Sequence, residues 1–126
     1  MAERPRMALR GIVLDSLDPR GLAGFYRELL GWSIGDDEPE WVTLQPPEGG
    51  AGLSFQVEPE YVRPVWPSHS EDQEMMVHLD IEVDDLAAAS AYAEGLGATL
   101  AEFQPQDLVR VYLDPAGHPF CLYLGG

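Results

Sequence analysis

The sequence predicts an α+β fold made of two paired βαβββ modules, and three observations lead to this prediction. The chain has 126 residues, 45% of them hydrophobic and 23% charged, which suits one ordinary globular domain over residues 1–126. The order strand, helix, strand, strand, strand occurs twice. Asp18 and Asp85, which each precede a helix, lie 67 residues apart, and so do Phe25 and Tyr92 within those helices. An internal repeat of this kind determines the fold before any single residue does.

The first module spans about residues 9–58. Alternating apolar residues predict a strand over 10–15. Asp18 and Pro19 then begin a helix as N-cap and first helical residue, and Gly31 ends it. The remaining elements are a short strand, an acidic turn, a second strand, a glycine-rich turn and a third strand, at 32–34, 35–40, 41–44, 45–50 and 52–58.

The second module repeats this order over about residues 75–126, after a connector at 59–74. The connector contains three prolines and an acidic run, which interrupt the periodicity. Asp85 begins the second helix and Gly97 ends it. Strands are expected over 76–83, 99–103, 108–113 and 119–124. Since neither module can cover its sheet alone, the two should pair into one domain.

The net charge of −15 limits the classes of partner. All seven basic residues are arginines, against 22 acidic residues. Such an acidic surface repels phosphate backbones and anionic lipids, which argues against nucleic acid and membrane as partners. No apolar run approaches the ~18–20 residues of a membrane span. The expected partner is a neutral or cationic small organic ligand.

Cysteine content and the first residues predict a cytoplasmic setting. Cys121 is the only cysteine, so an internal disulfide is impossible, which fits a reducing compartment. Residues 1–10 contain arginines without a following apolar segment, so they do not form a secretory signal.

Strand alternation separates a polar face from an apolar face, because side chains two residues apart point to the same side. The apolar face should pack against the helices. The polar face collects acidic, amide, imidazole, thiol and phenol groups, and the tryptophans offer an aromatic wall for stacking or cation–π contact. The predicted ligand-binding residues are His78, Asp80, Glu82, Asp15, Gln56, Cys121, Tyr123, Trp41 and Trp66.

The chain resembles the vicinal oxygen chelate superfamily, which includes glyoxalase I, extradiol dioxygenases and bleomycin-resistance proteins. The resemblance covers about residues 9–124. Its motifs are the Asp-led helix with Phe-Tyr, Leu-Leu-Gly-Trp at 29–32, and Asp-Pro-Ala-Gly-His-Pro-Phe at 114–120. It implies a cupped mixed sheet with the helices on its outer face, a ligand cleft inside the cup, and a homodimer.

The same resemblance implies four metal-ligand positions, two in each module. They are occupied here by Gly11, Ser54, His78 and Cys121, where the metal enzymes carry His, Gln or Glu. Only His78 matches. Glycine has no ligand atom and a serine hydroxyl is a poor ligand for Zn²⁺ or Fe²⁺. We therefore expect no metal and no cofactor, with His78 as a pocket or hydrogen-bonded core histidine and Cys121 as a small buried residue.

These observations favour a metal-independent small-molecule-binding protein with an acidic and aromatic cleft for a polar or cationic organic ligand. The alternative is a lyase, isomerase or dioxygenase-type enzyme with a degenerate or unrecognised metal site. A metal-free acid–base catalyst would use His78 with Asp80 or Glu82. A protein-interaction or regulatory module is a third hypothesis, supported only by the acidic connector.

Overall fold

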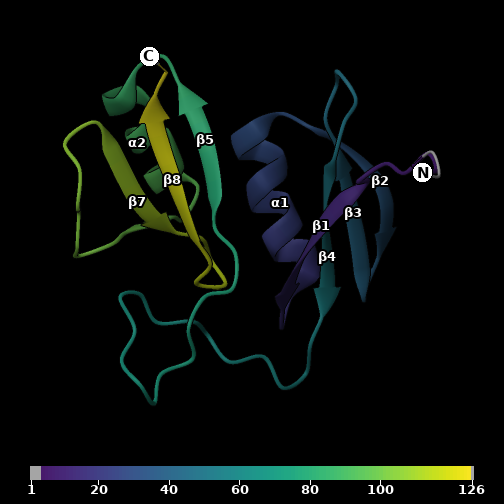
Figure 1. Ribbon diagram of the computed structural model, residues 1–126, viewed down its shortest axis with the longest axis horizontal. Helices are drawn as coiled ribbons and strands as arrows, with labels where there is room; N and C mark the ends of the chain where they lie inside the picture. The colour runs from purple at the N-terminus through teal and green to yellow at the C-terminus, as the bar shows by residue number, and fades with distance from the viewer. Residues whose placement is uncertain (1–3, 126) are drawn as a thin grey trace.

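The first module forms a four-stranded sheet with one helix. The computed structural model describes residues 4–125. The strands pair in the order β1-β4-β3-β2, with β1 parallel to β4 and the other pairs antiparallel. The elements are β1 (Gly11–Ser16), α1 (Pro19–Leu30), β2 (Ser33–Glu38), β3 (Trp41–Gln45) and β4 (Gly52–Val57) (Figure 1).

The second module repeats this topology in the order β5-β8-β7-β6, again with one parallel pair, β5 and β8. The α+β fold of two βαβββ modules is therefore confirmed. Strand pairing stays within each module, so β1 and β5 are edge strands of two separate mixed sheets. The elements are β5 (Leu79–Val83), α2 (Leu86–Gly95), β6 (Thr99–Leu100), β7 (Val109–Leu113) and β8 (Pro119–Leu124).

Both helices begin at the predicted caps. The side chain of Asp18 accepts a hydrogen bond from the backbone N–H of Gly21 at 3.0 Å, and Asp85 accepts one from Ala88 at 3.0 Å. Gly31 ends α1 in the left-handed conformation at φ 71°, which glycine adopts without steric strain. The short polar residue before each apolar run therefore sets the start of each helix.

Three strands differ in length from the prediction by more than one residue. β2 extends into the expected acidic turn as far as Glu38, and residues 39–40 form the turn itself. Within β2, the N–H of Asp36 donates a hydrogen bond to the hydroxyl of Thr43 at 2.8 Å. β5 begins only at Leu79, because Pro119, which would face the preceding residue in register, has no N–H to donate. β6 stops at Leu100. After this residue, hydrogen bonds of the Gln104 side chain take the place of further backbone pairing with β7.

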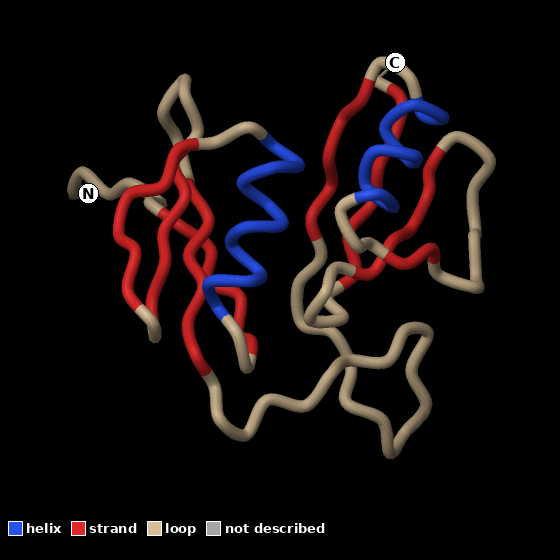
Figure 2. The backbone as a smooth tube through the Cα atoms, turned by 180° about the vertical axis from the view of Figure 1, so that it is seen from behind, coloured by secondary structure: helices blue, strands red, loops and turns tan. Residues whose placement is uncertain are grey.

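One hydrophobic core joins the two modules. α1 lies between the two sheets (Figures 1 and 2). Its Tyr26 ring stacks on Phe55 of the first sheet at a centroid distance of 5.8 Å, and its Phe25 ring lies 5.8 Å from Phe120 of the second sheet. The aromatic residues of α1 thus pack against both sheets.

The predicted division of the strand faces is also observed. Leu14, Phe55 and Leu122 are buried, whereas their neighbours Val13 and Gln56 are exposed. The polar faces therefore stay open. Among the described residues, no helix combines the length and the apolar character that a membrane crossing requires.

Candidate functional site

A pocket of about 470 Å³ lies on the open face of the second sheet. Its floor consists of residues from three adjacent strands. Asp80 on β5, Cys121 on β8 and Val111 on β7 are successive register partners, so their side chains point to the same face. His78, just before β5, and Tyr123, two residues after Cys121, extend this floor. Strand alternation alone therefore places these five side chains together.

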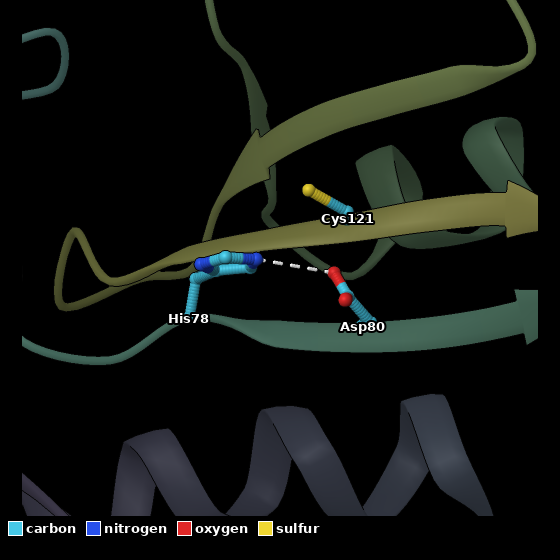
Figure 3. A group of neighbouring side chains, drawn as sticks. All are labelled: His78, Asp80 and Cys121. Carbon is cyan, nitrogen blue, oxygen red and sulfur yellow. Dashed lines mark ion pairs between the residues drawn. The ribbon is translucent and has the colours of Figure 1, made fainter.

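His78, Asp80 and Cys121 form a compact group (Figure 3). The Nε2 atom of His78 lies 3.2 Å from Oδ1 of Asp80. One imidazole nitrogen, one carboxylate oxygen and the Sγ atom of Cys121 all lie within 4.8 Å of one another. The histidine and aspartate side chains are 42% and 61% exposed, so solvent reaches this group freely.

The thiol of Cys121 is kept in its neutral form. Partial burial raises its pKa above the ordinary value, and the negative charge of Asp80 and its hydrogen bond with the thiol raise the pKa further. A nucleophilic cysteine needs a lowered pKa. Cys121 is therefore not an activated thiolate in this environment.

The pocket has one aromatic wall that comes from the loops. Trp66 of the connector lines it, and the ring of Phe103 lies 5.6 Å from the Trp66 ring at an angle of 38°. The sequence predicts Trp66 in this role. Phe103 packs against the Trp66 ring but does not itself line the pocket.

The predicted residues of the first module lie apart from this pocket. The side chain of Gln56 donates a hydrogen bond to Asp15 Oδ1 at 2.7 Å, and Trp41 is the register partner of Gln56. Glu82 lies at the far end of β5, against Gly125. The structure therefore brings together His78, Asp80, Cys121, Tyr123 and Trp66, but not the four other predicted residues.

Asp15 lines a second pocket, of about 300 Å³, between β1 and the connector. Tyr61 and His118 also line it. The Tyr61 hydroxyl donates to the carbonyl of Ala116 at 2.9 Å and lies 3.2 Å from Nε2 of His118. That nitrogen lies 2.7 Å from the Asp15 carbonyl, which can only accept, so Nε2 carries the proton.

The second pocket therefore lies at a hydrogen-bonded junction of the two modules and the connector. Burial, followed by the negative charge of Asp114, raises the pKa of Tyr61 to about 12. No sequence pattern places Tyr61 beside His118. The two residues are 57 positions apart, and only the folded connector joins them.

The structure has two βαβββ modules around one core and a polar pocket on an open sheet face. These features define the class of paired-module proteins that the sequence motifs indicated. A family model described as a glyoxalase-like domain matches residues 11–123. The chain belongs to this glyoxalase-like family, within the vicinal oxygen chelate superfamily. A search of curated proteins finds no match.

Solved structures share the fold at low sequence identity. A glyoxalase/bleomycin resistance protein/dioxygenase family enzyme from Burkholderia phytofirmans PsJN is 18% identical with a TM-score of 0.73, over 94% of this chain and 98% of that one. Lactoylglutathione lyase from Agrobacterium tumefaciens is 18% identical with a TM-score of 0.62, over 97% and 96%. TnmS3, an antibiotic binding protein from Streptomyces sp. CB03234, is 18% identical with a TM-score of 0.61, over 98% and 100%.

The four metal-ligand positions that the family resemblance implies do not fit a metal in this chain. Gly11 supplies no ligand atom, and a Cβ atom added to it would lie 3.5 Å from the Gly52 carbonyl oxygen and 3.6 Å from the Ser54 hydroxyl. Ser54 has Val13 and Thr43 as register partners, which add one apolar group and one hydroxyl. The two first-module positions therefore supply no nitrogen or carboxylate donor of the kind that such a metal needs.

Proposed function

We propose that the chain binds a small polar or cationic organic ligand in the pocket of the second module, without a metal. The observation that carries this proposal is the lining of that pocket, which combines the His78–Asp80 pair with the aromatic ring of Trp66. A volume of about 470 Å³ lies in the ordinary range for small-molecule sites.

The chemistry of the lining favours a cation with an aromatic or aliphatic part. Asp80 offers a carboxylate that is 61% exposed and can pair with a positive group. Trp66 offers a ring face for stacking or a cation–π contact. Leu108 and Val109 provide apolar surface beside these groups. The net charge of −15 attracts cations to the whole surface.

Family membership alone does not select between binding and catalysis. The similar structures include proteins described as a lyase and as an antibiotic binding protein. The proposal of a binding protein therefore depends on the residues of this chain. Its metal independence is supported by Gly11, which has no ligand atom, and by Ser54, whose hydroxyl is a poor metal ligand.

The test is a calorimetric titration of the chelator-treated protein with benzyltrimethylammonium, an aromatic quaternary cation. We expect saturable binding, weakened at least about tenfold, or ~1.4 kcal/mol, by Asp80→Asn. Trp66→Ala should weaken it as well. Glu48→Gln is the charge-matched control, since Glu48 is exposed in a turn of the first module. Equal affinity in Asp80→Asn and Glu48→Gln would contradict the proposed site.

A metal-free lyase or isomerase is the second candidate function, favoured by one observation. His78 Nε2 lies 3.2 Å from Asp80 Oδ1, a distance at which the carboxylate orients the imidazole ring. Such a pair could transfer a proton to or from a bound substrate. Turnover of an α-hydroxycarbonyl substrate that disappears in His78→Ala would support catalysis over simple binding.

A further inference from the structure

We propose that the second pocket, at the junction of β1 and the connector, is a separate binding site for an aliphatic organic cation such as a primary alkylammonium ion. The volume of this junction pocket, about 300 Å³, lies at the lower end of the range for small-molecule sites. The inference goes beyond the proposed function and does not depend on it, since the two pockets have only one lining residue in common, Met75.

Exposed aliphatic side chains gather at the junction pocket. They come from β1, from the connector and from the segment just before β5. Their exposed fractions are 45% for Val13, 59% for Val62, 83% for Met76 and 44% for Val77. Covering such groups is favourable, and a patch of exposed apolar side chains with a polar rim is typical of a binding groove. The pocket therefore offers a surface that an aliphatic chain can cover.

Carboxylates surround this apolar surface. The carboxylate of Asp15 accepts a hydrogen bond from the Gln56 side chain at 2.7 Å, and that of Glu58 accepts one from a connector N–H at 3.2 Å. Glu60 and Glu74 are exposed, and their carboxylates form no ion pair within the part of the chain that the structure describes. These two carboxylates beside an aliphatic surface match a molecule with one positive end and one apolar end.

Hydrogen bonds hold the connector wall of the junction pocket in place. The side chains of Tyr61 and Arg63 donate to adjacent carbonyls of the 114–118 turn, both at 2.9 Å. The N–H of Val65 donates to the carbonyl of Gln73 at 2.7 Å, which closes the connector loop on itself. A wall that is ordered before the ligand arrives lowers the entropic cost of binding.

Charge and ring chemistry separate the possible occupants. A second copy of the chain carries the same net charge of −15, so the exposed carboxylates would repel its acidic surface. An aromatic cation gains more in the other pocket, where Trp66 offers a ring face. In the junction pocket the Tyr61 ring already lies against His118, at a centroid distance of 5.5 Å. An aliphatic cation is therefore the occupant that this lining favours.

The experiment titrates the full chain, isotope-labelled at its methionine methyl groups, with n-hexylammonium and follows the methyl resonances by NMR. Met76 lines the junction pocket but not the other pocket, and Met76→Leu assigns its signal. We expect a saturable shift of the Met76 signal and none for Met7, which is exposed in the N-terminal segment. n-Butylammonium should bind more weakly, by about fourfold for each methylene that the longer chain buries in addition.

A pair of double variants tests the role of the rim. Glu60→Gln combined with Glu74→Gln should weaken n-hexylammonium binding at least about threefold, as expected for the loss of two exposed charge contacts. Glu40→Gln combined with Glu48→Gln is the charge-matched control, since both residues are exposed in turns of the first module, and it should bind like the natural chain. Circular dichroism checks that each variant is folded. An equal loss in both double variants would show only general attraction to an acidic surface and would overturn the proposal.

Three further results would also contradict the site. Equal affinity for n-butylammonium and n-hexylammonium would show that the apolar surface takes no part. A Met76 signal that moves with protein concentration, without any amine, would assign this surface to a second copy of the chain. Saturation with benzyltrimethylammonium should leave the Met76 titration unchanged, and displacement of n-hexylammonium would show that the two ligands share one site.

Discussion

Asp114 of the Asp-Pro-Ala-Gly-His turn has a structural role, which its burial and hydrogen bonds define. Its side chain is 1% exposed. One oxygen accepts hydrogen bonds from the N–H groups of Ala116 and His118, both at 2.9 Å, and the other accepts from the hydroxyl of Tyr26 at 2.7 Å. Burial raises the pKa of Asp114, while these hydrogen bonds and the charge of His118 oppose that shift. Both oxygens are satisfied internally, so the turn is a structural motif.

Tyr61 provides a prediction for alkaline pH. Burial raises its pKa to about 12, above the ordinary ~10 of a tyrosine. A raised folded-state pKa stabilises the fold fully below pH ~10, and this contribution is lost as the pH rises from about 10 to 12. Tyr61→Phe should therefore lower the free energy of unfolding by about 1 kcal/mol at pH 8, by removing the bond to Ala116, and should flatten its decline above pH 10.

Urea unfolding at intervals from pH 8 to 11.5 measures both effects. Tyr92→Phe is the control, since Tyr92 is 51% exposed and donates to a carbonyl on the surface. An alkaline slope that is the same in Tyr61→Phe and in the natural chain would show that ionisation of Tyr61 does not contribute to it.

At the scale of elements, the sequence predicts those element boundaries that depend on residues close together in the chain. The helices begin at Asp18 and Asp85 because each side chain satisfies a free N–H of the first turn. The prediction for β6 is too long because the end of this strand depends on a side chain. Gln104 donates to the carbonyls of Ala101 and Val111 and accepts from the N–H of Val111, so it takes the place of further strand pairing.

Gly24 gives a prediction about helix α1. It lies within Pro19–Leu30, and a Cβ atom added there would meet no other atom within 4 Å. Gly24→Ala should therefore raise the free energy of unfolding by about 0.5–1 kcal/mol, because alanine loses less backbone entropy in a helix. Chemical denaturation of the purified variant measures the gain.

Gly21 is the matched control in the same helix. A Cβ atom there would collide with the carboxylate of Asp18, which is the N-cap. Gly21→Ala should consequently lose the cap hydrogen bond and show a lower stability than Gly24→Ala. If both variants were stabilised equally, the steric explanation would be wrong.

At the scale of the whole molecule, strand alternation predicts which side chains lie on the same face of a sheet. It does not predict how the faces of the two sheets are arranged relative to each other. It placed Asp80, Cys121 and Tyr123 together, and the structure shows them in one pocket. It could not show that Asp15 and Gln56 lie on a separate sheet face, because long-range packing sets the relation between the modules. The homodimer expected from the resemblance stays a prediction.

The two modules are coupled through Tyr26, and this leads to the last prediction. Tyr26 belongs to α1 of the first module, is fully buried, and donates a 2.7 Å hydrogen bond to Asp114 of the second. Tyr26→Phe keeps the ring but leaves a buried carboxylate oxygen without its partner. Since hydrogen bonds to charged groups contribute about 1.5–3 kcal/mol, the free energy of unfolding should fall by about 2 kcal/mol.

Tyr92→Phe again provides the comparison, because Tyr92 of α2 also bonds across the modules, to the Glu28 carbonyl at 3.0 Å, but at the surface. Its loss should change stability by less than about 0.5 kcal/mol, as is usual for exposed positions. Urea unfolding monitored by tryptophan fluorescence and by circular dichroism would compare the two. Since Tyr26 packs against Phe55 and Phe120 together, both modules should still unfold in one transition in Tyr26→Phe. Two separate transitions would show that this single hydrogen bond, and not the shared aromatic core, makes the modules cooperative.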